Sequence, residues 1–403
     1  MTQFNDSKIV SLISEQEDDK AVAVNNHIHS PYSFSSFSSI EQAVDLAVKE
    51  GINVLGINDF FVTHGYALFN ETCLKKGVYP MFNIEFIGLH KQFQSDGLRI
   101  NDPNNPGRIY LSGKGLKKSY TLSKENQEKF DVLIESSQLQ IREMIVKLNE
   151  WLSAISAPFK LSYEEVQSKF AKQLVRERHI ATAIRNAVNE LFKSTDAKLN
   201  FYAQLFGEPA KSDIDKPAAI EEELRGKLLK AGGKAFVAED EKAFLSPEEI
   251  ASIISDAGGI ITYPLLLDDA KGNYTDFEKD KELLAKRLKE LNIFSIEFIP
   301  SRNSFEALKD YSEWFYKQGF LVSYGTEHNT PALTPLEVSC RNGVKLNNSL
   351  LEINYKCTCM IAAHQYLVEN GLEGYLDAEG KPDLKNADKF VQLGNALIKK
   401  HIR

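Results

Sequence analysis

Short apolar runs alternate with amphipathic helical segments from about residue 21 of the chain. The runs AVAVN (21–25) and NVLGIND (53–59) have strand character, and IEQAVDLAVKEG (40–51) between them has helical spacing. The run YPMFNIEFIGL (79–89) continues this alternation. Connections this short favour parallel strands with helices packed outside them. The pattern therefore predicts an α/β barrel or an open α/β sheet.

The alternation is interrupted after Leu111 and resumes later in the chain. Residues from roughly 121 to 235 are rich in Glu, Lys, Gln, Leu and Ala at helical spacing, which predicts a helical insertion. Strand-like runs return at GGIITYPLLL, NIFSIEFIP and GFLVSYG, and the tail after Asn342 has helical character. We expect five parts: an N-terminal lead (1–20), a first barrel part (21–120), the helical insertion (121–235), a second barrel part (236–342) and a C-terminal helical extension (343–403).

Composition and charge narrow the class of protein. The 403 residues are 43% hydrophobic and 26% charged, which is typical of a globular protein with a large core. The net charge of -8 gives no overall attraction to polyanions, so we expect a small-molecule substrate and neither a nucleic-acid polymer nor a membrane as partner. The N-terminal stretch lacks the pattern of an export signal, and no apolar run approaches the roughly 20 residues of a membrane span. We expect a cytoplasmic protein whose 4 cysteines form no disulfide scaffold, and its oligomeric state stays open.

Two histidines end the first predicted strand, in NNHIHSPYSFSS. Side chains two residues apart point to the same side of a strand, so His27 and His29 can bind one metal ion. On spacing alone, two surface imidazoles are an equally good interpretation. Other polar side chains lie at or near the ends of the later strands: Asp59, Glu85, Glu297, Glu327 and His328. The carboxyl ends of parallel strands converge, so these groups predict a site at the barrel mouth.

These motifs resemble the PHP (polymerase and histidinol phosphatase) family of phosphoesterase barrels over most of residues 22–335. HIHSPYSFSS resembles the family motif HxHSxxSDG, GINVLGINDFFVTHG resembles a strand ending in TDHD, NIEF resembles the strand with a bridging glutamate, and GFLVSYGTEHN resembles GSDxH. LVRERHIATAI and IITYPLLL are similar to the RxHxARAL helix and the AHP strand of the nucleotide and oligoribonucleotide phosphoesterases. The resemblance implies a distorted (β/α)7-type barrel of the PHP kind.

The resemblance also implies a metal site. The family typically binds two or three metal ions, and the residues that match one complete position are His27, His29, Glu85 and Glu327, the last in place of the usual Asp. Other residues stand at the remaining ligand positions: Phe34, Phe60, Phe61, Tyr263 and Asn329. We therefore expect one divalent ion, Zn²⁺, Mn²⁺ or Fe²⁺.

The remaining candidates take roles around that ion. A hydroxide on the ion would attack a phosphoester, and Asp59 or His328 would move protons. Asp59 has the alternatives of capping the next helix or orienting a ligand imidazole. The candidate substrate-binding residues are Arg178, His179, Arg302, Tyr263 and His64. For the two arginines and His64, a surface position without function is the alternative interpretation. The CxC pair of Cys357 and Cys359 is expected to be two buried thiols rather than a metal site.

Two further interpretations of function stay open, and so does whether the chain is an enzyme. The aromatic replacements at the mouth would lower the local dielectric and offer flat faces to a carbohydrate-like ligand without phosphate. The same side chains could instead fill the space of a lost metal cluster. The chain would then be a non-catalytic binding module with a PHP fold.

Overall fold

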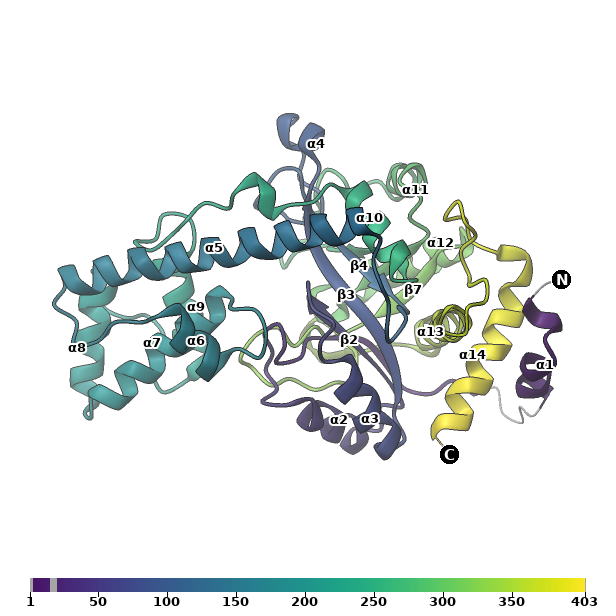
Figure 1. The fold of residues 1–403 in the computed structure, drawn as a ribbon, viewed down its shortest axis with the longest axis horizontal. Helices are drawn as coiled ribbons and strands as arrows, with labels where there is room; N and C mark the ends of the chain where they lie inside the picture. Colours follow the sequence, from purple (N-terminus) through teal and green to yellow (C-terminus); the bar gives the residue numbers. More distant parts are fainter. Residues whose placement is uncertain (1–2, 15–19, 403) are drawn as a thin grey trace.

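The computed structural model describes residues 3–14 and 20–402. The predicted N-terminal lead therefore lies partly outside the described residues. Its described part forms a short 3-10 helix (Gln3–Asn5) and helix α1 (Ser7–Ser14), which packs against the last helix of the chain (Figure 1).

A sheet forms the centre of the molecule (Figure 1). It has seven strands, which are neighbours in sequence order. The strands are β1 (Val24–Ile28), β2 (Val54–Phe60), β3 (Tyr79–Leu89), β4 (Arg108–Lys114), β5 (Ile260–Leu265), β6 (Ser295–Phe298) and β7 (Leu321–Tyr324). The end of β1 also pairs with the segment that follows β7, through a bridge between Ile28 and Glu327. This bridge nearly closes the sheet into a barrel, which confirms the predicted fold class.

Strand β4 departs from the parallel arrangement that the sequence predicts. It runs antiparallel to both β3 and β5, whereas the other neighbouring strands of the barrel are parallel. The connection from β3 to β4 contains only the short helix α4 (Lys91–Ser95). Parallel neighbours are usually joined by a full crossover helix, as β2 and β3 are by α3, and the β3–β4 connection contains no helix of that length.

Helices cover the outside of the barrel between consecutive strands. They are α2 (Ile40–Lys49), α3 (Tyr66–Lys76), α10 (Pro247–Asp256), α11 (Lys281–Glu290) and α12 (Phe305–Lys317). Side chains cap several of their first turns, such as Ser39, which accepts a hydrogen bond from the backbone of Gln42. Ser246 and Glu249 form a reciprocal capping box at the start of α10.

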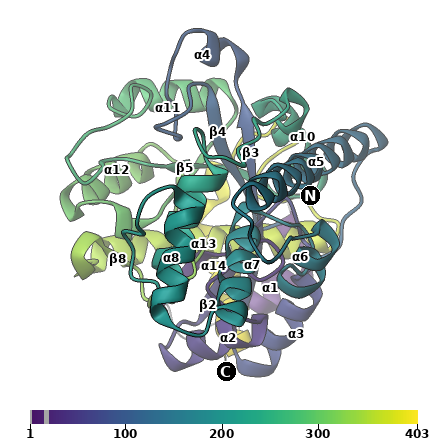
Figure 2. The same cartoon turned by 90° about the vertical axis from the view of Figure 1, so that its left-hand side faces the viewer.

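A helical region between β4 and β5 projects from the barrel (Figures 1 and 2). It contains α5 (Lys124–Ala154), α6 (Tyr163–Phe170), α7 (Glu177–Leu191), α8 (Thr195–Phe206), α9 (Pro217–Leu224) and a π-helical turn (Arg225–Leu229). These helices bury a second apolar core, separate from that of the barrel. The long helix α5 joins the two, because Leu133 packs in the barrel core and Leu148 in the second core.

The end of the chain forms two long helices after a small hairpin of β8 (Ser339–Cys340) and β9 (Val344–Lys345). Helix α13 (Asn348–Glu369) packs against strands of the barrel, and α14 (Ala387–Ile402) packs against α13. The thiols of Cys357 and Cys359 are buried, as predicted. Within the described residues, no helix has the length and apolar character needed to cross a membrane.

Candidate metal centre

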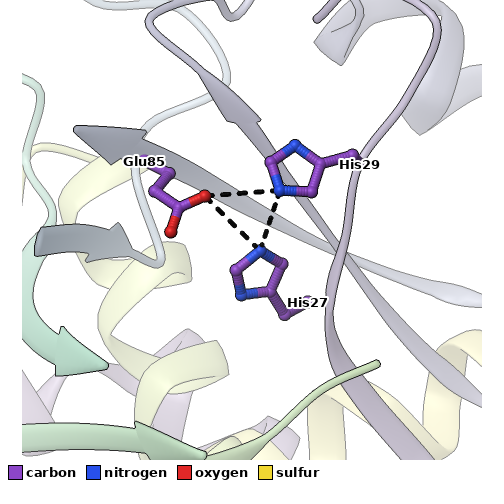
Figure 3. Close-up of side chains that lie close together, drawn as sticks. All are labelled: His27, His29 and Glu85. Carbon is purple, nitrogen blue, oxygen red and sulfur yellow. Dashed lines mark hydrogen bonds and ion pairs between the residues drawn. The ribbon is translucent and has the colours of Figure 1, made fainter. Parts of the chain in front are cut away.

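Three side chains from the region of β1 and β3 point toward one another inside the barrel (Figure 3). The Nε2 atoms of His27 and His29 are 3.3 Å apart. Glu85 Oε2 lies 3.3 Å from the Nε2 of His29 and 3.8 Å from that of His27. His27 belongs to β1 and His29 follows the last residue of this strand, so the alternation of the strand directs both rings to one side.

The opposite ring nitrogens of both histidines have partners that fix the ring orientation. His27 Nδ1 lies 3.1 Å from Glu297 Oε1, and an ionised carboxylate can only accept a hydrogen bond. His29 Nδ1 lies 3.1 Å from the Ser33 hydroxyl, which in turn donates to Asp59. These contacts favour a proton on Nδ1 of both rings, so that each ring presents an unprotonated Nε2 to the centre of the cluster.

This arrangement fits a metal ion. Glu85 Oε2 is buried and has no hydrogen-bond partner among the described residues. When Glu85 is ionised, three electron-rich atoms face one another in a buried space, an arrangement that a bound cation would stabilise. Two nitrogens that each lie about 2.0–2.1 Å from one tetrahedral ion are about 3.4 Å apart, close to the observed separation. Two imidazoles and a carboxylate suit Zn²⁺, Mn²⁺ or Fe²⁺.

The pKa values of Glu85, Glu297 and His29, in and beside the cluster, are shifted in different directions by burial and by neighbouring charges. Burial raises the pKa of Glu85 to about 8, although the imidazole of His27 and the ammonium of Lys114 act in the opposite direction. Burial also acts to raise the pKa of Glu297, but Lys114 and His27 outweigh it and hold this pKa at about 2. Burial lowers the pKa of His29. The cluster thus stands beside one firmly ionised carboxylate.

A cavity of about 520 Å³ lies between the barrel mouth and the helical region. Glu85 lines it, together with three of the aromatic rings predicted at the mouth, Phe34, Phe60 and Phe61. The two histidines are not part of the cavity wall, and Phe60 stacks on the ring of His29 with centroids 4.9 Å apart. Glu85 is therefore the member of the cluster that a ligand in the cavity would reach first.

Glu327, the predicted fourth ligand, does not join the cluster. Its carboxylate forms an ion pair with Arg302 at the edge of the cavity. The backbone of Glu327 donates to the carbonyl of His27 and accepts from the N–H of His29, in a turn with a positive φ of 63°. The backbone thus holds the residue beside both histidines, while its side chain is directed to Arg302.

Asp59, predicted to move protons, has structural partners instead. It is buried, accepts hydrogen bonds from Ser30 and Ser33, and reaches His29 through Ser33. This contact agrees with the alternative in which Asp59 orients a ligand imidazole.

His328, the other predicted proton carrier, is also engaged in structural contacts. Its Nδ1 lies 2.8 Å from the Thr326 hydroxyl and its Nε2 lies 2.8 Å from the carbonyl of Thr334, so both ring nitrogens are occupied. The ring also stacks on Phe37.

Three predicted substrate-binding residues do not line the cavity. The hydroxyl of Tyr263 is buried and donates to Glu278, which directs the side chain away from the mouth. His179 accepts a hydrogen bond from the backbone N–H of Arg176 at the start of α7, and burial lowers its pKa to about 3. His64 is exposed in the turn before α3.

The two predicted arginines do line the cavity, but each already contacts a carboxylate. Arg178 lies 3.2 Å from Glu222, and Arg302 pairs with Glu327. Either guanidinium would have to leave its partner before it could bind a ligand with its full charge.

Another arginine at the cavity, Arg176, was not predicted from the sequence. Its guanidinium lies 5.1 Å from the ring centroid of Phe60 and 5.2 Å from that of Phe61. No carboxylate of the described residues lies within ion-pair distance of Arg176. Its position two residues before Arg178 gave no signal by which the sequence could separate the two.

Lys114 was likewise not predicted, and Glu297 was expected only as one of the polar groups near the strand ends. Both side chains are almost fully buried and form an ion pair next to His27. A lysine at the end of a strand ordinarily extends into solvent, so its type and spacing alone did not indicate this position.

Comparisons with known proteins agree with the fold and the motifs. Residues 25–209 match the model of the PHP domain family. A segment of 102 residues is 33% identical to DNA polymerase III subunit alpha of Staphylococcus aureus (strain MRSA252), covering 25% of this chain and 8% of that subunit. The chain thus spans a small part of that relative.

Two solved structures are similar to the chain. A protein of Bifidobacterium adolescentis, provisionally described as a metal-dependent phosphoesterase, aligns with a TM-score of 0.55 at 14% identity over 83% of this chain and 96% of its own. An amidohydrolase of Chromobacterium violaceum aligns with a TM-score of 0.49 at 14% identity, over 79% and 93% of the two chains. The first of these supports the barrel fold over most of the chain. The region that matches the PHP domain family begins in β1 and includes His27, His29 and Glu85.

Proposed function

We propose that the protein is a metal-dependent hydrolase that acts on a small phosphoester at a centre with one metal ion. The observation that carries the proposal is the convergence of two imidazole nitrogens and a buried carboxylate oxygen without a hydrogen-bond partner, on a glutamate that lines a cavity. The PHP domain match and the fold shared with a protein described as a metal-dependent phosphoesterase support it.

His27, His29 and Glu85 would hold the ion, and Glu85 would present the centre to the cavity. A bound divalent ion lowers the pKa of water to near 7 and polarises a phosphoryl oxygen. The chain itself supplies the ligand atoms, their orientation and a cavity for the ester.

Buried side chains around the cluster keep the two imidazoles in orientation. Ser33 and Asp59 do so for His29, and Glu297 does the same for His27. Neither Asp59 nor His328 is part of the cavity wall, so we assign Asp59 a positioning role and His328 a structural role rather than proton transfer.

Arg176 would bind the negative charge of the phosphoester. Its guanidinium borders the cavity above Phe60 and Phe61, and it has no carboxylate partner among the described residues. An unpaired guanidinium can donate two parallel hydrogen bonds to a phosphate. Because Arg178 and Arg302 are already paired with carboxylates, Arg176 is the better candidate.

The proposal is tested by metal content and turnover of the purified protein. We expect about one Zn²⁺, Mn²⁺ or Fe²⁺ per chain and hydrolysis of members of a panel of phosphomonoesters and phosphodiesters. His27→Ala and Glu85→Ala should lose both properties. His90→Asn, a change at the cap of α4 where Asn can still accept the capping hydrogen bond, is the matched control. A wild-type protein without a stoichiometric ion and without turnover would contradict the proposal.

One observation favours a second candidate, a binding module without catalysis. Phe60 covers His29, and neither histidine reaches the cavity wall. If this ring stays in place when a ligand binds, the ion serves the structure and no substrate reaches it. The same experiment separates the two, because the binding module would contain the ion and show no turnover with any ester of the panel.

A further inference from the structure

A lysine is buried inside the barrel next to the candidate metal centre. Lys114, the last residue of β4, is 1% exposed, and Glu297 on β6 is 0% exposed. The ammonium contacts the Glu297 carboxylate and also lies 3.3 Å from the carbonyl oxygen of Asn26. Burying two charges is costly, and an ion pair of this kind is weak evidence for stability by itself. Its contribution to stability therefore does not explain why this ion pair lies inside the barrel.

The carboxylate of this ion pair also contacts a ring nitrogen of His27, one of the candidate metal ligands. Glu297 Oε2 contacts Lys114, while Oε1 lies 3.1 Å from His27 Nδ1 and accepts a hydrogen bond from the Ser112 hydroxyl at 3.1 Å. The amide nitrogen of Asn58 is the other close polar group, 3.1 Å from Nδ1 and 3.0 Å from Nε2 of the same ring. Lys114 and Ser112 thus hold Glu297 from one side, and His27 meets it on the other.

We propose that the buried Lys114–Glu297 pair positions His27, with Lys114 holding the Glu297 carboxylate as the acceptor for Nδ1–H of His27 so that Nε2 faces His29 and Glu85. Glu297 and Lys114 are positioning residues, since neither is one of the three clustered donors. This inference rests on the proposed function in one respect: the orientation of His27 serves metal binding only if the centre holds an ion. The orientation itself is a property of the metal-free protein.

The pair has a consequence for the number of ions. Glu297 is a second buried carboxylate beside His27, and without Lys114 it would be available to a second cation. A cation that approached this carboxylate would lie next to the ammonium and be repelled. The pair therefore limits the centre to one divalent ion, because the ammonium of Lys114 occupies the position that a second ion would take.

The test compares two double variants that remove both charges and differ in one acceptor. Lys114→Met with Glu297→Gln keeps an oxygen that can accept from His27, whereas Lys114→Met with Glu297→Leu does not. The single variant Lys114→Met is measured as well. Arg185→Met is the matched control, because it breaks a largely buried ion pair with Glu221 in the helical region, away from the centre.

Two readouts are made on each protein. The ¹⁵N resonances of the His27 ring, recorded without metal, report which nitrogen carries the proton. Titration with Zn²⁺ against a chelator gives the dissociation constant and the number of ions. We expect Nδ1 protonation and one ion in the wild type, and the same in Arg185→Met. The Leu double variant should show mixed tautomers and bind Zn²⁺ about 10- to 100-fold more weakly than the Gln double variant.

Each outcome bears on the inference. Lys114→Met, if it folds, leaves the Glu297 carboxylate without its ammonium partner and should bind a second Zn²⁺, and the two double variants decide the positioning role if it does not fold. Equal Zn²⁺ affinities and equal tautomer signals in the two double variants would overturn the positioning role. Two ions in the wild type would overturn the limit to one. A protein that shows the expected tautomers but no turnover refutes the proposed function and leaves the positioning intact.

Discussion

At the scale of single residues, the candidate metal centre is defined by the direction of the lone pairs of His27, His29 and Glu85. Three donor atoms converge, whereas the carboxylate of Glu327 is held by Arg302. We expect Glu85→Gln to weaken Zn²⁺ binding by more than about a hundredfold, because loss of a ligand should exceed the 10- to 100-fold cost of losing an outer partner. Glu327→Gln should weaken it by less than about tenfold, since this carboxylate pairs with Arg302 and lies outside the group of three clustered atoms. Competition with a chelator measures both, and equal losses would show that Glu327 is a ligand after all.

The presence or absence of a carboxylate partner also predicts which arginine of the cavity binds the anion. Replacing Arg176 by Met should lower kcat/KM for a phosphoester by about 10- to 100-fold, since a hydrogen bond to a charged group contributes about 1.5–3 kcal/mol. Arg178→Met should change it by less than about threefold, because this side chain already contacts Glu222, which also contacts Arg225. Steady-state kinetics on both variants provides the check. A larger loss in Arg178→Met than in Arg176→Met would show that the anion binds to Arg178 instead.

The sequence predicts some of these residues and not others for physical reasons. The i, i+2 spacing places His27 and His29 on one side of a strand whatever the rest of the fold does. The direction of Tyr263 depends on a hydrogen bond to Glu278, which no local pattern encodes. Likewise, the difference between Arg176 and Arg178 lies in a carboxylate 44 residues away from Arg178 in the chain, that of Glu222.

At the scale of elements, the alternation of strands and helices predicts most of the barrel, because each crossover helix packs outside its own strands. Strand β4 is an exception, since the connection after β3 contains no full crossover helix and β4 runs antiparallel to β3. The position of Lys114 could not be predicted for the same reason. It lies inside the barrel only because β4 inserts between β3 and β5, and the alternation of the chain does not predict that insertion.

Helix α13 contains a histidine that should make stability depend on pH. His364 Nε2 contacts the carbonyl of Gly258, Nδ1 accepts from the backbone of Tyr375, and burial lowers its pKa to about 4. An unfolded chain has a histidine pKa of about 6.5, so the contribution of the neutral ring is complete well above pH 6.5 and is lost as the pH falls toward 4. Between about pH 7.5 and pH 5 the loss should be about 2 kcal/mol.

Urea unfolding of the wild type and of His364→Gln at several pH values tests this. The difference between their free energies of unfolding should shrink by that amount from the higher pH to the lower, because Gln does not titrate. Groups elsewhere in the chain affect both proteins equally and cancel in the difference. A difference that stays constant over this range would show that His364 is free to take up a proton in the folded protein.

At the scale of the whole molecule, two apolar cores meet along α5, and the cavity lies where they face each other. The sequence predicts a helical region between two barrel parts, but periodicity cannot say which of its residues cover the barrel mouth. That contact depends on Arg176 lying over Phe60 and Phe61, which come much earlier in the chain. The cavity therefore belongs to the assembled molecule rather than to either core.

The separation into two apolar cores predicts which elements a bound ligand protects from hydrogen exchange. An ion held by His27, His29 and Glu85 joins β1 to β3, so Zn²⁺ at 100 times its dissociation constant should add about 2.7 kcal/mol to the free energy of unfolding. Hydrogen exchange should slow in β1 and β3 while α8 stays unchanged. Adding inorganic phosphate to the metal-bound protein should extend protection to the start of α7, because Arg176 would then hold an anion. Glu85→Gln should abolish both effects, and Zn²⁺ protection of α8 without β1 would place the ion in the other core.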